Sequence, residues 1–338
     1  MSGDMGGHTG GHTGGRSGDV IVVGSGVIGL TTAVVLAGRG HRVRVWTREP
    51  AAETTSAVAG ALWWPYRIEP EALVGAWSLT SLRVYGELAA RPGETGVRLV
   101  PGVEAGSRLG ELGAWARQVP GLRELGPDEV PGGYGYGLAA RLPLIDMPVH
   151  LAWLRGRLEA AGGTVESREV GSLDEAVAEA GTGSAAGAVV NCTGLGARDL
   201  VPDPDVVPVR GQLVLVENPG IGSWFAAADK ASSTSTYFFP QPGRLVLGGT
   251  AEEGDRSPEA DPATAAAIVE RCARIRPEIA DARVLGHRVG LRPVRVGGVR
   301  LEREREPGGA RLLHNYGHGG AGVTVSWGCA YAVASLLA

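Results

Sequence analysis

The sequence predicts an α/β protein in which a Rossmann-like domain is interleaved with a mixed-sheet α+β domain. The first observation is a glycine-rich turn, residues 24–29, that follows a short apolar strand and opens an apolar helix, as at the start of a parallel sheet. The second is the change beyond Val206, where apolar and polar residues alternate as in antiparallel strands. Because the two patterns interleave along the chain, we expect both domains to be discontinuous.

The composition is that of an ordinary globular protein. The chain has 338 residues, of which 43% are hydrophobic and 20% are charged, and a formal net charge of −4 with both signs scattered. This pattern builds no basic face for binding nucleic acid. The three cysteines, Cys192, Cys272 and Cys329, form neither a CxxC pair nor a zinc spacing, and no metal cluster stands out. We therefore expect no disulfide framework and no metal, which fits a reducing cytosol.

The domain boundaries follow the same change of pattern. The first residues are mostly Gly with Ser, Thr and His, and they offer no apolar face to bury, so we expect a disordered tail. The predicted division is a tail over 1–18, a nucleotide-binding domain over 19–80, 145–200 and 285–338, and a substrate domain over 81–144 and 201–284.

The stretch between Val20 and Arg39 carries no charge and is apolar enough to suggest a signal peptide or a membrane span. Glycines interrupt it, and no A-x-A cleavage pattern follows it. A second strand-like run, 42–46, comes next. We therefore expect a strand over 19–23, a helix over 27–37 and a strand over 42–46, and no membrane segment.

The remaining elements follow from apolar spacing and from glycine and proline breaks. We expect helices over 77–90, 149–161, 262–275 and 323–336, strands over 164–167, 188–192, 212–217, 236–240 and 244–249, and a hairpin from 299–304 and 311–315. The segment from 99 to 136 is rich in Gly and Pro, and we expect it to be irregular.

The turn from Gly24 to Gly29 reads GSGVIG and has the spacing of a dinucleotide-binding turn. Gly24 permits the tight turn, Gly26 lets the backbone approach a pyrophosphate, and Gly29 lets helix and strand pack closely. The helix N-terminus then offers N–H groups to the phosphates. At the end of the next strand, Arg48 or Glu49 is placed to reach a ribose, and this corner does not distinguish NAD from FAD.

Two further motifs are placed to contact the same ligand. The string VVNCTG, which ends at Thr193 and Gly194, is an apolar strand that brings backbone close to the carboxyl edge of the sheet. The string HNYGHGGAGVT runs directly into the last helix and opens a second helix N-terminus. Flavin reduction builds negative charge that such an end stabilises, whereas nicotinamide develops no such anion. The pair of glycine-rich helix starts therefore favours FAD over NAD.

The candidate substrate residues are a cation and a hydroxyl. Arg292 lies between Leu291 and Pro293 in a strand-like segment, and a rigid guanidinium grips a carboxylate through two parallel hydrogen bonds. The hydroxyl of Tyr237 is placed to supply a further donor. His150, His287 and His318 are isolated. With a flavin as acceptor, no strong protein acid or base is required, because the substrate amine need only lose its proton before the Cα hydride passes to flavin N5.

Together these segments resemble the D-amino-acid oxidase family, which is closely related to D-aspartate oxidases. The strings occur in the family's order from Val20 to the end of the chain: GSGVIGL, TTSAVAGALWWPY, VVNCTG, RGQ, TYFFP, LGGT, GLRPVR, RLERE and HNYGHGGAGVT. The strings HNYGHGG and G-x-RPVR are far more specific than GxGxxG. The resemblance implies non-covalent FAD between the nucleotide-binding domain and a mixed-sheet substrate domain, and oxidation of D-amino acids to 2-oxo acids with ammonia and hydrogen peroxide.

The resemblance also implies roles for individual residues. Arg292 would hold the substrate carboxylate, Tyr237 would add its hydroxyl, and Gly320 would offer its carbonyl to the substrate amine. The expected cofactor-binding residues are Gly24, Ser25, Gly26, Val27, Ile28, Gly29, Thr47, Arg48, Thr54, Thr55, Ala59, Gly60, Val170, Thr193, Gly194, Gly319, Gly320, Ala321, Gly322, Val323 and Thr324.

The sequence departs from the family pattern at two places. Ser233 stands four residues before Tyr237, where many vertebrate members have a second tyrosine that forms part of an aromatic lid. The chain also ends without the peroxisomal tripeptide, which favours a bacterial-type cytoplasmic enzyme. The expected partners are a small D-amino acid and O2, with neither nucleic acid nor a membrane; a homodimer stays an open alternative.

Three rival functions stay open. A D-aspartate oxidase would need added positive charge, but Glu252 and Glu253 follow LGGT and are expected to repel an acidic substrate, while Lys230 is placed to compensate. A glycine- or sarcosine-type amine oxidase is disfavoured by RPVR and HNYGHGG. A flavin-binding protein without oxidase activity is disfavoured by Arg292 and Tyr237. We expect neutral D-amino acids as the preferred substrates.

Overall fold

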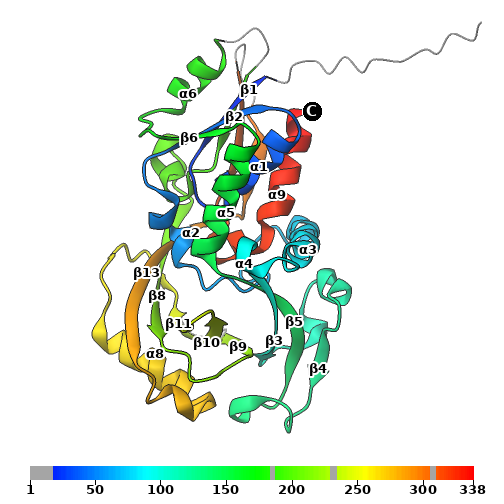
Figure 1. The fold of residues 1–338 in the computed structure, drawn as a ribbon, viewed down its shortest axis with the longest axis vertical. Helices are drawn as coiled ribbons and strands as arrows, with labels where there is room; N and C mark the ends of the chain where they lie inside the picture. Colours follow the sequence, from blue (N-terminus) through cyan, green and yellow to red (C-terminus); the bar gives the residue numbers. More distant parts are fainter. Residues whose placement is uncertain (1–17, 183–186, 229–233, 305–309) are drawn as a thin grey trace, which may run out of the picture.

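The computed structural model describes residues 18–182, 187–228, 234–304 and 310–338. It confirms the α/β class: two sheets with helices packed against them fill the described part of the chain (Figure 1). The predicted tail falls, apart from residue 18, outside the described ranges, as do Lys230 and Ser233.

The first sheet contains the glycine-rich turn. In the described ranges it has six strands in the order β14-β15-β7-β1-β2-β6. β1 pairs in parallel with both β2 and β7, and β15 pairs in parallel with β7. β1 is buried from Val20 to Val23, because an apolar run covered on both faces forms a central parallel strand. The bounds are β1 (Asp19–Val23), β2 (Arg42–Thr47), β6 (Thr164–Ser167), β7 (Ala188–Asn191), β14 (Arg300–Arg303) and β15 (Arg311–Tyr316).

Four longer helices cover or flank this sheet: α1 (Val27–Gly38), α3 (Glu71–Leu88), α5 (Met147–Ala160) and α9 (Gly322–Leu337). α1 contacts both α5 and α9, and α9 contacts α3 (Figure 1). By length and composition alone, residues 319–337 would suit a membrane span, but 67% of that segment is buried inside the protein. Its contacts with α1 and α3 are those of a core helix.

The second sheet is larger and mixed. Within the described residues it has nine strands in the order β12-β8-β11-β10-β9-β3-β5-β4, with β13 also paired to β8. Tyr237 and Arg292 lie on two of its strands, β10 and β13. The bounds are β3 (Val97–Ala105), β4 (Arg123–Leu125), β5 (Gly137–Ile145), β8 (Val206–Val216), β9 (Trp224–Ala228), β10 (Thr234–Gln241), β11 (Arg244–Thr250), β12 (Glu252–Glu253) and β13 (Val284–Arg295).

The shorter elements connect and cover the sheets. α8 packs against β8, β10 and β11 on the far side of the second sheet (Figure 1). The other helices are α2 (Thr55–Val58), α4 (Pro92–Thr95), α6 (Leu173–Ala180), α7 (Ala197–Leu200) and α8 (Pro262–Ile275), with 3-10 turns η1 (Ala51–Glu53), η2 (Leu109–Glu111), η3 (Ala114–Gln118), η4 (Pro131–Gly133), η5 (Gly194–Gly196), η6 (Pro277–Ile279) and η7 (Gly319–Ala321).

Two expectations about strands of the second sheet were wrong. The segment from 99 to 136 is not irregular throughout, because β3 runs through Pro101 and Gly102 and pairs with β5 and β9. A Cβ at Gly102 would overlap the Trp224 ring, so the glycine that breaks the sequence pattern is what lets the strands approach. The expected domain boundary, with the substrate domain ending at residue 284, does not match the sheets either. β13, which lies beyond that boundary, pairs with β8 in the second sheet.

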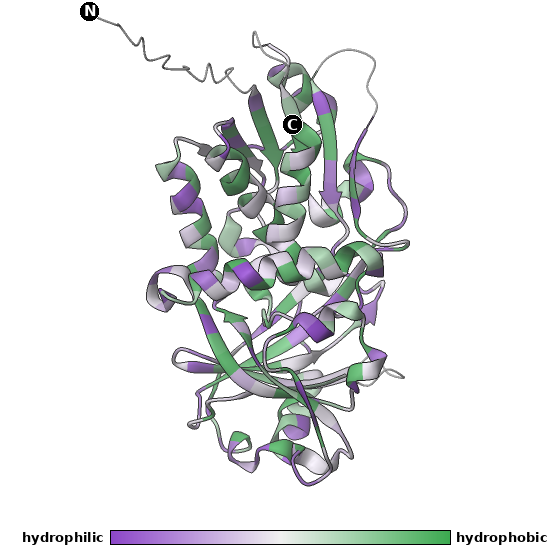
Figure 2. Cartoon of the chain, turned by 90° about the vertical axis from the view of Figure 1, so that its right-hand side faces the viewer, coloured by the Kyte–Doolittle hydropathy of each residue, from purple (hydrophilic) through white to green (hydrophobic). Residues whose placement is uncertain are grey.

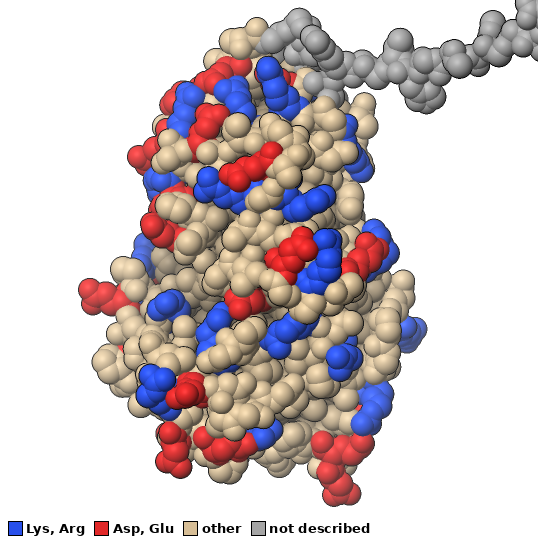
Figure 3. Space-filling model, in the orientation of Figure 1, with Lys and Arg blue, Asp and Glu red and all other residues tan. Residues whose placement is uncertain are grey.

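Burial follows the hydropathy of the elements. Trp46, Trp63 and Trp224 are among the largest fully buried side chains, and Figure 2 shows the strands of the upper half largely as hydrophobic. On the surface in Figure 3, Lys and Arg intermingle with Asp and Glu rather than forming a field of one sign. The mixed surface charge in this view marks no binding site, and the candidate site is therefore sought between the two sheets.

Candidate active site

One cavity of about 930 Å³ is lined by residues of both sheets. Its walls include the turn after β1, the ends of β2 and β7, and the segment from 53 to 66. They also include strands of the second sheet and the start of the last helix. The cavity therefore joins the carboxyl edge of the parallel strands, where nucleotides bind in such sheets, to the inner face of the mixed sheet.

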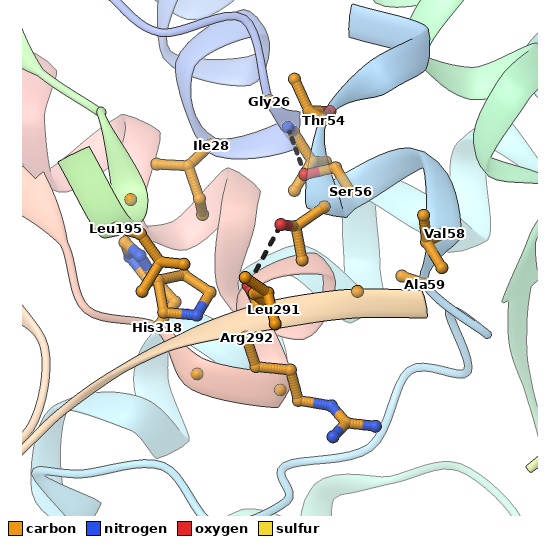
Figure 4. Close-up of a pocket in the computed structure, with 18 of the residues that line it drawn as sticks. Gly26, Ile28, Thr54, Ser56, Val58, Ala59, Leu195, Leu291, Arg292 and His318 are labelled. Carbon is orange, nitrogen blue, oxygen red and sulfur yellow. Dashed lines mark hydrogen bonds between the residues drawn. The ribbon is translucent and has the colours of Figure 1, made fainter. Parts of the chain in front are cut away.

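The turn after β1 is built for close backbone approach. Gly24 has a φ of +110°, and a Cβ there would lie 2.5 Å from the carbonyl oxygen of Cys192. A Cβ at Gly29 would overlap the carbonyl oxygen of Gly24. The N–H of Val27 donates to Ser56 Oγ at 3.0 Å (Figure 4). Ser56 thus takes one donor of the α1 N-terminus, and the N–H of Gly24 donates to the Trp46 carbonyl at 2.8 Å.

The end of β2 adds polar groups to this nucleotide end. Ser25 Oγ and Thr47 Oγ1 are 2.8 Å apart, and Thr47 also donates to the carbonyl of Glu49 at 2.6 Å. Arg48 pairs with the Glu49 carboxylate at 2.7 Å on the exposed side. Thr47, Arg48 and Glu49 all line the cavity. This corner is able to hold the hydroxyls of a ribose.

The start of the last helix forms the opposite wall. Gly319, Gly320 and Gly322 line the cavity, and so does the buried ring of His318. Among the described residues, His318 Nε2 has no hydrogen-bond partner. Burial lowers the pKa of His318 to about 3, so its imidazole is neutral at physiological pH. A buried polar atom normally has a hydrogen-bond partner. A polar ring system bound beside this glycine-rich helix start would supply one to His318 Nε2.

The substrate end brings together the residues expected from the sequence. Arg292, on β13, donates from Nη1 to the Thr250 carbonyl at 2.8 Å. Burial is the main cause that raises the pKa of Tyr237, and the nearby Arg292 opposes it. The phenol therefore stays protonated and able to donate. A Cβ at Gly320 would lie 3.4 Å from Arg292 Cδ, so the backbone of Gly320 borders the same space.

Glycines shape the walls around these two side chains. A Cβ at Gly211 would lie 2.5 Å from Arg292 Cζ, and one at Gly249 would lie 2.8 Å from the Tyr237 hydroxyl. A Cβ at Gly248 would overlap the Tyr237 ring. No carboxylate among the described residues pairs with Arg292, in contrast to Arg210, which pairs with Glu252 at 2.6 Å. Arg292 is thus a positioned cation at the end of the cavity.

Most of the residues expected from the sequence share this cavity. Its lining includes Tyr237, Arg292, Gly24, Ser25, Gly26, Val27, Ile28, Thr47, Arg48, Thr54, Thr55, Ala59, Gly60, Val170, Thr193, Gly194, Gly319, Gly320, Gly322 and Val323. The lining excludes Gly29, Ala321 and Thr324. Gly29 packs behind the turn, Ala321 is buried, and Thr324 Oγ1 donates to the Trp64 carbonyl at 3.0 Å.

The two acids expected to repel an acidic substrate do not face the cavity. Glu252 is held by Arg210 at the edge of the sheet, Glu253 is exposed, and only Ala251 of that segment lines the cavity. That argument from the sequence was wrong, because a local run of acids does not show which way the side chains point.

Ser56, Tyr66 and Glu104 are among the cavity residues that sequence reasoning missed. Ser56 caps the helix start, and Tyr66 lies close enough to Tyr237 to affect its pKa. Glu104 lines the same cavity from β3, which was expected to be irregular. Tyr66 ends the aromatic stretch LWWPY, a signal that was visible in the sequence. Glu104 had no such signal, because its position depends on the pairing of distant strands.

The fit of Gly211 against Arg292 gives a testable prediction. In Gly211→Ala the new methyl group pushes the guanidinium aside, and a displacement of about 1 Å at a reacting site can cost about 10²-fold. We expect kcat/KM for D-alanine to fall on that order, mainly through KM, with the cofactor content unchanged. Gly286→Ala, on β13, makes only ordinary contact with Arg288 and is the control. Normal kinetics in Gly211→Ala would show that Arg292 does not hold the substrate.

Comparison with known proteins agrees with this geometry. A model of a family described as FAD dependent oxidoreductase matches residues 19–336. A D-amino-acid oxidase of Streptomyces coelicolor is 66% identical over 320 residues, which cover 94% of this chain and 96% of that protein. A D-amino-acid oxidase of Rubrobacter xylanophilus is 50% identical, with 94% of each chain covered.

The solved structures support the fold. A glycine oxidase from Bacillus cereus superposes with a TM-score of 0.78 at 20% identity, over 95% of this chain and 97% of that one. The glycine turn, the His318 nitrogen without a partner among the described residues and the cavity of about 930 Å³ fit FAD as the bound group. By its sequence and its fold, this chain belongs to the FAD-dependent oxidoreductase family.

Proposed function

We propose that this protein is a D-amino-acid oxidase, which converts a D-amino acid, O2 and water into a 2-oxo acid, ammonia and hydrogen peroxide. The observation that carries the proposal is Arg292, a guanidinium without a carboxylate partner among the described residues, beside the protonated Tyr237. Both line the same cavity as the nucleotide turn, and Figure 4 shows Arg292 well apart from Gly26 of that turn. The two relatives named D-amino-acid oxidase, which match nearly the whole chain, support the same activity.

The residues of the chain bind and orient the substrate. Arg292 holds the α-carboxylate through its fork of N–H donors, and Tyr237 donates a further hydrogen bond to it. The backbone of Gly320, which borders Arg292, would offer its carbonyl to the substrate amine and so help to orient the substrate. FAD, when bound, would supply the acceptor for the two electrons of the oxidation, and O2 would be the final acceptor.

The chain needs to supply little acid–base chemistry. His318 is neutral at physiological pH because burial lowers its pKa to about 3, so it adds no positive charge to the cavity wall. Only the neutral form of the substrate amine carries the lone pair that helps expel the hydride. The site therefore works by holding the deprotonated amine in place, and binding and orientation account for its catalysis.

The activity is tested by a peroxide-coupled assay. We expect D-alanine to give one hydrogen peroxide per 2-oxo acid, and L-alanine, glycine and sarcosine to be turned over at least tenfold less efficiently. Heat-denatured protein should release its flavin as FAD into the supernatant. A preference for glycine or sarcosine would show that the protein is a different amine oxidase. Bound FAD without hydrogen peroxide formation from any amino acid would show that it is a flavin-binding protein without oxidase activity.

The same assay separates neutral from acidic substrates. Among the described residues, Arg292 is the cation that lines the substrate end of the cavity. The α-carboxylate of the substrate binds to it. A second carboxylate would lie unpaired near the buried Glu104. We expect kcat/KM for D-aspartate to be at least about tenfold below that for D-alanine, which corresponds to about 1.4 kcal/mol. A tenfold preference for D-aspartate would make the protein a D-aspartate oxidase.

A further inference from the structure

Glu104 is a buried carboxyl group that the reaction does not use. Its side chain is 5% exposed and lines the cavity that holds Arg292 and Tyr237. Among the described residues, it has neither a hydrogen-bond donor nor a counter-charge: burial alone perturbs it and raises its pKa to about 8. Buried acids are normally paired, so an unpaired carboxyl at a cavity wall points to a partner that arrives with a ligand.

The strand register shows where this carboxyl lies relative to the substrate residues. Glu104 on β3 pairs with Ala226 on β9, and Ala226 pairs with Tyr237 on β10. Residues directly opposite each other across a sheet point to the same face. Glu104 and Tyr237 are therefore two strands apart on one face, about 9–10 Å between their Cα atoms.

A small residue, Ala226, separates the two side chains in the sheet. Ala226, the residue between them, has only a methyl group, and it lines the cavity with them. Ala226 and Glu104 form a wall of the cavity on the second sheet, whereas the glycine turn follows β1 of the first sheet. A substrate whose α-carboxylate is held at Arg292 and Tyr237 has this wall available for its side chain.

We propose that Glu104 is a specificity-determining residue that binds the cationic end of long D-amino-acid side chains, such as the ammonium of D-lysine or the guanidinium of D-arginine. This inference rests on the proposed oxidase function. The long aliphatic stem of such a side chain passes over Ala226, and its charge reaches the carboxyl group at the wall. The substrate's two charged ends thus meet opposite charges at opposite ends of one pocket.

The same residue is compatible with neutral substrates. Because the raised pKa leaves Glu104 largely protonated at neutral pH, a short apolar side chain leaves no buried charge behind. A nearby cation favours the ionised form, so the carboxyl becomes a charged partner only when a cationic side chain is bound. The expectation that neutral D-amino acids alone are preferred is thereby extended to basic ones.

The test compares D-lysine with D-norleucine, which has the same stem without the terminal amine. We expect the wild-type enzyme to oxidise D-lysine at least as efficiently as D-norleucine. In Glu104→Gln, which keeps the size and removes the charge, the ratio of the two kcat/KM values should fall at least tenfold, mainly through KM for D-lysine. D-alanine, whose methyl group does not reach Glu104, should keep its kcat/KM within about threefold.

The controls separate this inference from the proposed function. Glu253→Gln removes an exposed carboxylate that does not line the cavity and should leave the ratio unchanged. An unchanged ratio in Glu104→Gln, with D-alanine still oxidised, would overturn the inference alone. Absence of turnover with D-alanine in the wild type would overturn the function. If Glu104→Gln does not fold, the wild type decides: a tenfold preference for D-norleucine over D-lysine refutes the role of Glu104.

Discussion

Arg292→Ala is expected to lower kcat/KM for D-alanine by about 30- to 5,000-fold while the protein keeps its FAD. The guanidinium is held by the Thr250 carbonyl and by its fit against Gly211, so it meets the substrate carboxylate already oriented. Removing one partner of a buried, hydrogen-bonded charge pair costs about 2–5 kcal/mol. The measurement is steady-state kinetics by peroxide release, with FAD content determined on the same preparations.

Arg292→Lys and a surface variant sharpen this experiment. Lysine restores a positive charge but not the planar fork, so we expect only part of the activity to return. Arg288→Ala removes an exposed arginine of the same strand, whose Nη1 donates to the adjacent His287 carbonyl, and should leave kinetics unchanged. Near-normal kcat/KM in Arg292→Ala would mean that the carboxylate is held elsewhere in the cavity.

Gly29→Ala is expected to abolish tight FAD binding and to destabilise the fold. The added Cβ would overlap the carbonyl oxygen of Gly24, and neither group is the end of a flexible side chain. The turn must therefore shift, and the backbone that would hold the pyrophosphate of FAD would shift with it. Overpacking costs about 1–3 kcal/mol, and loss of the bound cofactor removes further stability. Bound FAD per chain and the Tm would both report the loss.

Gly38→Ala is the matched control in the same helix. A Cβ at Gly38 meets nothing within 4 Å, so alanine adds no clash and reduces the freedom of the unfolded chain, an effect of about 0.4–1 kcal/mol in favour of folding. We expect normal FAD content and an unchanged or slightly raised Tm. Equal FAD content in the two variants would refute the role given to Gly29 in packing the turn.

The first strand, turn and helix were predictable because their signals are local. β1 spans Asp19–Val23 and α1 begins at Val27, as expected from the sequence. Short apolar runs that are separated by glycines at sterically restricted positions are compatible with few alternative structures. The helix over 262–275 and the hairpin of β14 and β15 were predicted correctly for the same reason.

The elements that were missed depend on partners far away in the chain. β3 contains Pro101 and Gly102, which argue against a strand, and it forms because β5 and β9 supply its hydrogen bonds on both sides. The place of Glu252 was misjudged because its ion pair with Arg210 comes from the pairing of β12 with β8. Local propensity is overridden where tertiary pairing satisfies the backbone.

By itself, the sequence predicted the nucleotide-binding turn, a flavin rather than a nicotinamide and a guanidinium for a carboxylate, because a short motif with a defined steric or electrostatic role indicates each of them. Only the tertiary structure decided which distant residues share the cavity wall beside Arg292 and Tyr237. Glu104 and Tyr237 are more than a hundred residues apart, and the register of β3, β9 and β10 places them on one face of one sheet. A shift of that register by one residue would turn Glu104 to the opposite face, and nothing in the sequence near Glu104 encodes that register.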